Sequence, residues 1–484
     1  MLSSARTIVV VGGGFSGTVL AANLLRHPPL APTRLILMER SKQFCCGVAY
    51  APQTHSYVLN VPAARMSASS AEPDDLIEYL RRREPHASGA SYVSRQLYGE
   101  YLADYLRLAE EAAPPHVRLE RVTCEVTSLR PLDRYGPVLV CAGGRQWLAD
   151  QVVLACGDPP PAVRPYAVEV ANHSAYVRDP YRQAIKRSSE KIVFLIGTGP
   201  TMVDLAEALA EANPGVQLIA VSRHGLLPAS QAEVSRGTQT EARVQFAPAS
   251  PLSLRGLVAQ VRRLIREKQS QGQDWRDTIV QLRSAVPRLW HGLDEAERRR
   301  FLRHVRVYWD IHRHRLPPTV AANLRALQAS GQLQVRAGWI KGLTSNGAGI
   351  TVQWIARGQR EPQELRVDRV IDCSGPGGRL EQTTDALLRN LQHTGIATAD
   401  ALGLGLRTAS HGALVDSEGV GATQLFYLGP MLRADHWEAT AVGELRQHAE
   451  GLAAVLKLHG APGLTHSSSS PTSPLHDAHL AAGA

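Results

Sequence analysis

The chain has 484 residues, a formal net charge of +9 and 44% hydrophobic residues. A single hydrophobic core stops growing near about 250–300 residues, so we expect at least two domains, and the composition excludes fibrous and disordered proteins. The six cysteines include no C-x-x-C pair, which excludes a disulfide framework and the common zinc spacings. No apolar run reaches the roughly 18 residues of a membrane helix, and the N-terminus lacks a signal-peptide pattern. We therefore expect a cytoplasmic protein.

The N-terminal segment predicts a dinucleotide-binding turn. A β-type run over residues 8–11 leads into Gly12-x-Gly14-x-x-Gly17 and then into a helical pattern. Glycines at these positions allow a tight turn, close approach of a pyrophosphate and close packing of the helix on the strand. A second apolar run ends at Glu39, where a carboxylate can bind an adenosine ribose; a plain strand-turn-helix is the alternative. The expected FAD contacts in this part are Gly12, Gly14, Phe15, Ser16, Gly17, Glu39 and Arg40.

A second strand-turn-helix follows in residues 191–210, KIVFLIGTGPTMVDLAEALA. It keeps the first two glycines, and Met202 takes the place of the third. The position that matches the ribose carboxylate holds His224, so no acid repels a 2′-phosphate, and Ser222 and Arg223 beside it can bind one. We therefore predict NADPH rather than NADH; the alternative is that Arg223 only ends a strand. The expected contacts are Gly197, Gly199, Pro200, Thr201, Ser222 and Arg223.

A basic segment with helical periodicity, residues 251–318, ends in FLRHVRVYWDIHRHRLPP. Its histidines do not share one helix face, which argues against a metal site, and no aromatic platform accompanies the charge for nucleic acid. We expect a helical insertion over the cleft between nicotinamide and flavin, with His304 packed inside the helix bundle. The candidates for binding an anionic substrate or the cofactor phosphates are Arg313, His314 and Arg315.

Two later turns complete the layout of a two-dinucleotide flavoprotein. One predicted strand ends at Cys156-Gly157, and another is followed by a Gly429-Pro430 turn. A helix is expected to begin around Trp437, with its positive end toward the flavin. Hairpin strands in the region 331–372 are expected to return to the FAD sheet. The expected map is an FAD domain over 1–185 and 320–460, an NADPH domain over 186–319 with its insertion at 251–318, and a disordered tail at 461–484.

Several segments together resemble the bacterial FAD/NAD(P)-binding oxidoreductases, which are distantly similar to flavin-dependent N-hydroxylating monooxygenases. They include GVAYAPQTHSYVLNVPAARMSA, IGTGPTMVD, VSRHGLLP, IDCSGPGG and LFYLGPMLRADHWEATAVGELR. The resemblance implies an α/β fold with two Rossmann-like dinucleotide-binding domains, FAD and NADPH as cofactors, and a small-molecule substrate. In similar proteins the first segment runs along the flavin, which implies FAD contacts at Val48, Ala49, Tyr50, Asn60 and Val61, and Val126 is a further expected contact.

These inferences predict an FAD-dependent NADPH oxidoreductase. In the favoured form it is a monooxygenase, in which O₂ forms a C4a-hydroperoxyflavin that hydroxylates a small nucleophilic, amine-type substrate. The alternatives left open are an NADPH-dependent reductase of an organic acceptor and a slow-turnover redox sensor that holds both cofactors. Disulfide reduction is disfavoured because adjacent Cys45 and Cys46 cannot act as a C-x-x-C pair. We expect no metal, nucleic-acid or membrane partner, and no residue identifies itself as a catalytic acid or base.

Overall fold

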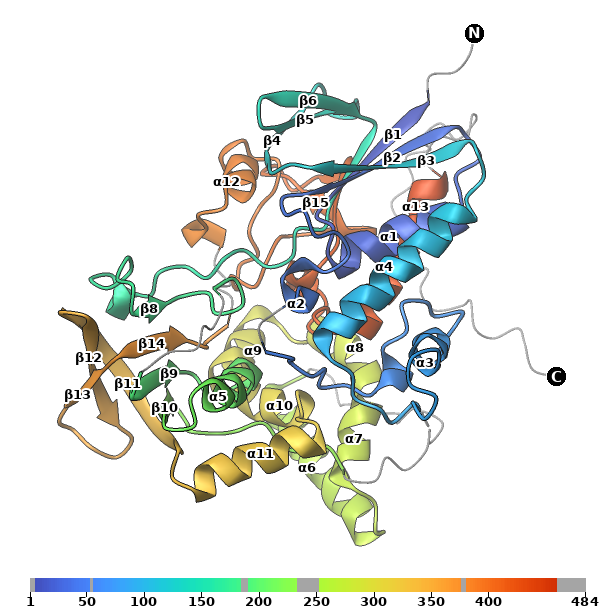
Figure 1. Ribbon diagram of the computed structural model, residues 1–484. Helices are drawn as coiled ribbons and strands as arrows, with labels where there is room; N and C mark the ends of the chain where they lie inside the picture. The colour runs from blue at the N-terminus through green and yellow to red at the C-terminus, as the bar shows by residue number, and fades with distance from the viewer. Residues whose placement is uncertain (1–4, 53–54, 184–189, 233–251, 376–379, 459–484) are drawn as a thin grey trace.

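Two mixed, mainly parallel sheets form the centres of two lobes, shown at the upper right and the lower left of Figure 1. The computed structural model describes residues 5–52, 55–183, 190–232, 252–375 and 380–458. The first sheet has the order β15-β16-β7-β1-β2-β3. Its strands are β1 (Arg6–Val11), β2 (Thr33–Glu39), β3 (Val117–Thr123), β7 (Gln151–Leu154), β15 (Ala413–Val415) and β16 (Gly421–Tyr427).

Both faces of the first sheet are buried, which is why its central strands are continuous apolar runs. Ile8 and Val10 of β1 face a cluster built by three helices, whereas Val9 and Val11 face a second cluster on the opposite side. The helices on the first face are α1 (Phe15–Arg26), α4 (Arg95–Glu111) and α13 (Val442–Leu458). The second face is covered by α12 (Ala386–His393) and a three-stranded sheet of β4 (Val126–Pro131), β5 (Val138–Ala142) and β6 (Arg145–Ala149).

The second sheet has the order β13-β12-β11-β10-β9-β14-β8. Helices α5 (Pro200–Ala212) and α11 (Pro318–Ala329) pack on one of its faces. Its strands are β8 (Tyr176–Val177), β9 (Ile192–Ile196), β10 (Gln217–Ser222), β11 (Leu333–Asn346), β12 (Gly349–Ala356), β13 (Gln363–Val367) and β14 (Arg369–Asp372). The α/β fold with two strand-turn-helix units, β1–α1 and β9–α5, confirms the predicted fold class.

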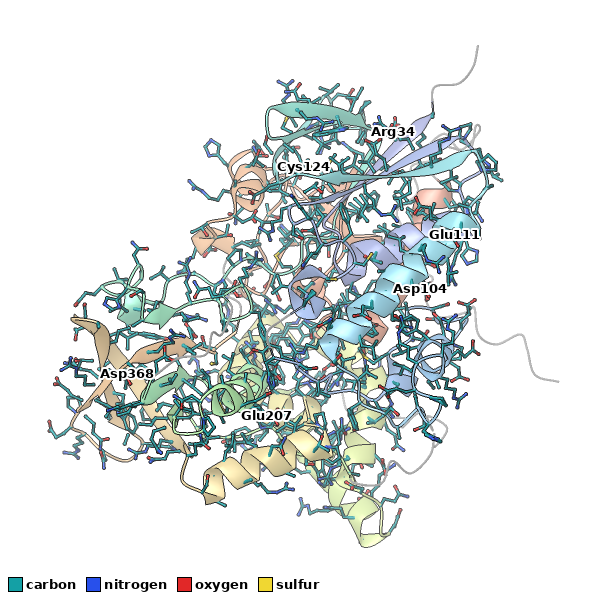
Figure 2. The ribbon with its side chains drawn as sticks, viewed as in Figure 1. Arg34, Asp104, Glu111, Cys124, Glu207 and Asp368 are labelled. Atoms are coloured by element: carbon teal, nitrogen blue, oxygen red, sulfur yellow. The ribbon has the colours of Figure 1, made fainter. Side chains whose placement is uncertain are left out.

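The expected return of residues 331–372 to the first sheet is wrong. β11 pairs in parallel with β10, and β14 pairs in parallel with β9, so these strands extend the second sheet. Asp368 ties the turn before β14 to the start of β9, because its carboxylate accepts hydrogen bonds from the backbone of Lys191 and Ile192. Figure 2 shows Asp368 and Glu207 in the lower lobe, away from Arg34 and Glu111 of the first domain. The other domain boundaries stay predictions, and the predicted tail lies outside the described residues.

The predicted helical insertion is present between β10 and α11. It contains α6 (Leu254–Ser270), α7 (Trp275–Leu282), α8 (Val286–Gly292), α9 (Glu295–Arg300) and α10 (Arg306–Arg313), which share a small apolar core of their own. A π-helical turn, Phe301–Val305, joins α9 to α10. This turn adds a residue to the helical repeat and rotates the faces on either side of it. His304 is therefore exposed rather than packed inside the bundle, which corrects the prediction.

The last helix begins later than its sequence pattern indicates. A 3₁₀ turn, Pro430–Ala434, follows the Gly429 turn, and α13 begins only at Val442 instead of around Trp437. The residues between them are held by the insertion: Trp290 and Phe301 pack against Trp437, with ring centroids 5.0 and 5.1 Å apart. Contacts of Trp437 with the insertion therefore delay the start of α13 relative to the position that the sequence pattern predicts.

Candidate cofactor and substrate site

The first glycine turn leaves no room for side chains where the backbone must pass closely. A Cβ on Gly17 would lie 1.9 Å from the carbonyl oxygen of Gly12, and a Cβ on Gly12, whose φ is +111°, would lie 2.4 Å from that of Ala155. Gly14 caps α1 without a side chain. The backbone N–H groups of the first turn of α1, including those of Phe15 and Ser16, are therefore available to a pyrophosphate.

Glu39 stands at the end of β2, next to this turn. Its carboxylate accepts hydrogen bonds from the backbone N–H groups of Gly13, at 2.8 Å, and Ser41, at 3.0 Å. These bonds hold the carboxylate beside the glycine turn, where the predicted ribose would lie. Arg40 is exposed and lies 3.7 Å from Glu125, whereas Val126 is buried in the apolar cluster under the sheet.

The ends of β7 and β16 are tied together on the same edge of the sheet. The Tyr427 hydroxyl donates to the carbonyl of Gly157 and accepts from the N–H of Met431, at 3.1 and 3.2 Å. Arg433 forms an ion pair with Asp158 at 3.0 Å. These contacts hold the predicted Cys156-Gly157 and Gly429-Pro430 turns side by side, at the carboxyl ends of neighbouring parallel strands.

The short helix α2 (Gly47–Tyr50) lies against the glycine turn. Its Gly47 backbone approaches Gly14, and its Tyr50 ring packs edge-on against Tyr98 at 4.7 Å. Val48 is 41% exposed, which is unusual for a valine in the middle of a domain. An uncovered apolar side chain, an open glycine turn and a carboxylate at the end of β2 together fit an FAD that lies along this edge.

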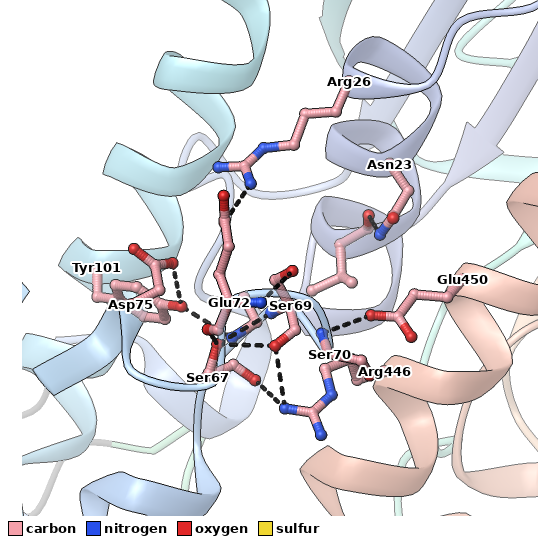
Figure 3. Close-up of polar contacts among 12 residues, drawn as sticks. Asn23, Arg26, Ser67, Ser69, Ser70, Glu72, Asp75, Tyr101, Arg446 and Glu450 are labelled. Atoms are coloured by element: carbon pink, nitrogen blue, oxygen red, sulfur yellow. Dashed lines mark hydrogen bonds and ion pairs between the residues drawn. The ribbon is translucent and has the colours of Figure 1, made fainter. Parts of the chain in front are cut away.

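A polar network supports the neighbouring segment, residues 59–72 (Figure 3). Arg446 of α13 donates to the carbonyl oxygens of Ser67 and Ser69, at 2.9 and 3.4 Å. Tyr101 of α4 donates to Asp75 and accepts from the backbone N–H of Ala68, both at 2.8 Å. Helices α4 and α13 therefore fix the segment that carries Asn60 and Val61.

The second glycine turn differs from the first in how much free space surrounds its glycines. Gly197, with φ at +108°, would place a Cβ 2.9 Å from the carbonyl oxygen of Cys373, whereas a Cβ on Gly199 would meet nothing within 4 Å. Met202, at the position of the third glycine in the first motif, is fully buried in the core. Pro200 and Thr201 begin α5 beside the open Gly199 position, which leaves space for a second dinucleotide.

The two predicted 2′-phosphate contacts, Ser222 and Arg223, differ in how accessible their polar groups are. The Ser222 hydroxyl lies 2.8 Å from that of Thr198 and accepts from the backbone N–H of Gly225, so its oxygen is engaged locally. Arg223 is exposed. A residue that the sequence analysis missed, Arg357, follows β12 next to them.

Sheet register places Arg357 there. Ser222 pairs with Ala337 across β10 and β11, and the Ala337 carbonyl accepts from the Arg357 backbone at 2.8 Å. Burial lowers the pKa of His224, and the charges of Arg223 and Arg357 act in the same direction. Only the register of strands distant in sequence reveals this cationic pair, so no local sequence signal could have found it.

A cavity of about 900 Å³ joins the first domain to the helical insertion. It brings together four of the predicted flavin contacts, all three substrate candidates and the residues just before and at the start of α13. Its lining includes Ala49, Tyr50, Asn60, Val61, Arg65, Tyr92, Trp275, Arg276, Arg313, His314, Arg315, Thr440, Ala441 and Val442. Trp437 does not line it, because its ring packs against the insertion.

The three substrate candidates differ in their environments. Arg313 forms an ion pair with buried Glu438 at 2.7 Å. Burial, together with the charge of Arg313, lowers the pKa of His314 to about 4, so its imidazole is neutral at neutral pH. Arg315 is only 7% exposed and has no carboxylate within ion-pair distance among the residues that the structure describes.

Cysteine and metal chemistry are limited at this site. Burial raises the pKa of Cys45 to about 11 and that of Cys156 to about 12, and it raises the pKa of Cys46 as well. These groups are thiols rather than thiolates at neutral pH. Within the described parts of the chain, no group of three or more His, Cys, Asp or Glu side chains is placed to hold a metal ion, and no helix is long and apolar enough to span a membrane.

Several solved structures share the fold of this chain. It is similar to L-lysine 6-monooxygenase from Pseudomonas syringae, at 17% identity over 93% of this chain and 98% of that one, with a TM-score of 0.63. Ornithine hydroxylase from Pseudomonas aeruginosa matches at 16% identity over 94% and 99%, with a TM-score of 0.63. The cadaverine monooxygenase of Erwinia amylovora matches at 12% identity over 94% and 95%, with a TM-score of 0.62. The chain thus has the two-dinucleotide-binding flavoprotein fold.

Within that fold, residues 9–159 match the model of the family described as FAD-NAD(P)-binding. No curated protein sequence matches the chain. The segment contains the first glycine turn, Glu39, α2 and β7, which are the elements at which we expect FAD. These findings confirm the resemblance and the cofactor classes inferred from the sequence, and they agree with an oxidoreductase of the flavin-dependent NAD(P)H type.

Proposed function

We propose that the chain is an FAD-dependent NADPH oxidoreductase that acts as a monooxygenase on a small amine. The observation that carries this proposal is the single cavity at the carboxyl edge of the first sheet. One wall consists of residues expected beside the flavin, Ala49, Tyr50, Asn60 and Val61, and the opposite wall belongs to the helical insertion. A substrate in this cavity would lie between the two, within reach of the flavin ring.

FAD would be held by the first glycine turn, Glu39 and α2. When bound, FAD accepts hydride from a nicotinamide and activates O₂. The start of α13 at Val442 lines the cavity, so the positive end of this helix would stabilise negative charge on the cofactor. Trp275, Ile279 and Val280 of α7 give the opposite wall apolar surface, which limits the water that reaches the reacting atoms.

The nicotinamide dinucleotide would lie on the second glycine turn, at Gly197, Gly199 and the start of α5. NADPH is the preferred coenzyme in this proposal because Arg223 and Arg357 stand together at the end of β10, where a 2′-phosphate would project. Among the described residues, no carboxylate forms an ion pair with either of them.

The proposal is tested with the purified holoprotein. NADPH is expected to bleach the flavin absorbance without oxygen, at lower concentrations than NADH. In air, NADPH consumption is then compared with hydroxylated amine and with hydrogen peroxide, using L-ornithine, L-lysine, L-aspartate and cadaverine as trial substrates. Product formed in proportion to NADPH supports a monooxygenase. Flavin reduction without hydroxylated product, but with turnover of an added quinone, would favour the organic-acceptor reductase instead.

A further inference from the structure

One guanidinium in the cavity wall, that of Arg315, is buried without a counter-charge. The residue is only 7% exposed, and its Nε has no hydrogen-bond acceptor within the parts of the chain that the structure describes. Its Nη1 donates only to the carbonyl of Arg276, at 3.3 Å. A buried charge is costly unless it is paired, so an anion that bound at this guanidinium would stabilise the arrangement.

Four other guanidinium groups in the same lining have carboxylate partners. Arg313 pairs with Glu438, and Arg276 pairs with Asp274 at 3.0 Å. The same holds for Arg95, which pairs with Asp204, and Arg283, which pairs with Glu444. Of these five arginines, Arg315 is the one that is available to a ligand.

The surroundings of Arg315 reinforce this difference. Burial lowers the pKa of its guanidinium to about 10, and the charges of Arg276, Arg313 and Arg65 act in the same direction, whereas the charge of Asp274, which is paired with Arg276, opposes them. Trp275 lies beside it, with the guanidinium carbon 5.8 Å from the ring centroid. The backbone is also fixed, because the N–H of the next residue, Leu316, donates to the carbonyl of Ala229 and its carbonyl accepts from the N–H of Gln231, both at 2.8 Å. Arg315 therefore has a fixed position from which to receive an anionic group.

We propose that Arg315 binds a carboxylate of the substrate, so that the substrate is an amine that carries an acid group, such as an amino acid, rather than a simple diamine. This inference rests on the proposed function, because it assigns the substrate class of that same site. A diamine would bring further positive charge to a wall that already has excess positive charge. An amino acid would instead place its carboxylate against Arg315 and leave its amine free to reach toward Tyr50 and Asn60 on the flavin side.

A phosphate of NADPH is another source of negative charge in such a cleft, and the test separates the two. Binding to the oxidised holoprotein is measured by calorimetry without turnover, with L-aspartate, L-ornithine and L-lysine, their carboxyl methyl esters, and cadaverine. We expect at least one free acid to bind ten-fold or more tightly than its ester and than cadaverine. If no acid binds more tightly than its ester, the proposal is overturned, whether or not NADPH reduces the flavin.

The Arg315→Met variant keeps the apolar stem and removes the charge. We expect it to abolish the preference for acid over ester while the dissociation constant of NADP⁺ changes less than two-fold; weakened NADP⁺ binding with an unchanged acid preference would overturn the proposal. Arg255→Gln removes an exposed cation from α6 and should leave both constants unchanged. If Arg315→Met does not fold, Arg315→Lys serves instead, because it keeps the charge but loses the planar fork and should reduce the preference without removing it.

Discussion

We expect coenzyme choice to depend on a few exposed side chains at the end of β10. Arg223 and Arg357 reach the same place from strands that are far apart in sequence, while the Ser222 oxygen is engaged by Thr198 and Gly225. The sequence analysis assigned the 2′-phosphate to Ser222 and Arg223. In our interpretation the two arginines carry most of the preference, because a guanidinium binds a phosphate through two parallel hydrogen bonds.

We therefore expect Arg357→Gln to raise the KM for NADPH about ten-fold, the loss of about 1.4 kcal/mol of binding, and to leave the KM for NADH nearly unchanged. Initial rates of flavin-dependent NADPH and NADH oxidation measure this. The control is Arg366→Gln, an exposed arginine on β13 of the same sheet, which should change neither KM. Equal losses for both coenzymes would contradict the assignment.

At the scale of elements, the two glycine turns have the same form but differ in whether they have room for a side chain. The Cβ of an alanine at position 17 would overlap the carbonyl oxygen of Gly12, whereas one at position 199 would stand in open space. The first clash disturbs the packing of α1 on β1. The second Cβ would only occupy the space where a pyrophosphate approaches the backbone.

Gly17→Ala is thus expected to give protein that loses FAD or fails to fold. Gly199→Ala is expected to fold, to keep its full FAD content and to bind NADPH at least ten-fold more weakly. FAD content per chain, melting temperature and NADPH titration distinguish the two variants. Full FAD content in Gly17→Ala would contradict the packing argument.

Helix α13 carries a pH-dependent contribution to stability. The ring of His448 lies 4.6 Å from that of His436, which in turn lies 5.7 Å from that of His291. Burial, together with the charge of His436, lowers the pKa of His448 to about 4. Because the unfolded chain takes up this proton near pH 6.5, the contribution is complete above that pH and is lost as the pH falls toward 4.

We expect His448→Asn to reduce this loss of stability at acid pH by about 2 kcal/mol. This is below the ~3 kcal/mol that the full pKa difference implies, because the ring keeps some contact with water. Urea unfolding between pH 7 and pH 4.5, with FAD in excess, measures the change. His393→Asn, at the exposed end of α12, is the control and should leave the pH dependence as in the parent. If His448→Asn left the pH dependence of the free energy of unfolding unchanged, groups other than His448 would be responsible for the loss of stability at acid pH.

At the scale of the whole molecule, a buried polar group connects the two domains. Asp204 of α5 accepts hydrogen bonds from Arg95 of α4 and from the Tyr181 hydroxyl, both at 2.6 Å. Arg95 also lies over the rings of Tyr57 and Tyr181. Since the nicotinamide must reach the flavin from the second domain, this junction sets the relative position of the two cofactor sites.

Asp204→Asn keeps the shape of the side chain and removes the charge that holds Arg95. We expect flavin reduction by NADPH to slow about ten-fold while the FAD content stays the same. Rapid mixing without oxygen measures the reduction rate. Glu120→Gln disrupts the ion pair with Arg34, which lies within one sheet at the surface, and should not affect this rate.

Local signals in the sequence were sufficient for the strand-turn-helix units, because each depends on neighbouring glycines and apolar residues. They also located the insertion and the basic residues of the cavity wall. They failed where contacts between distant segments decide: the sheet that β11 and β14 join, the exposure of His304 after the π-helical turn, and the start of α13. The position of Arg357 beside Arg223 could be predicted only from the strand register. The lack of an ion-pair partner for Arg315 among the described residues could be predicted only from the positions of all its neighbours.

The protonation state of the cysteine thiols has a practical consequence for the proposed monooxygenase. Burial raises the pKa of Cys45, Cys46, Cys124, Cys156 and Cys373, and thiolates rather than thiols react with hydrogen peroxide. Peroxide that escapes during futile turnover would therefore find few reactive sulfur atoms in the chain that releases it. Prolonged assays in air should then lose activity through cofactor release or unfolding before they lose it through cysteine oxidation.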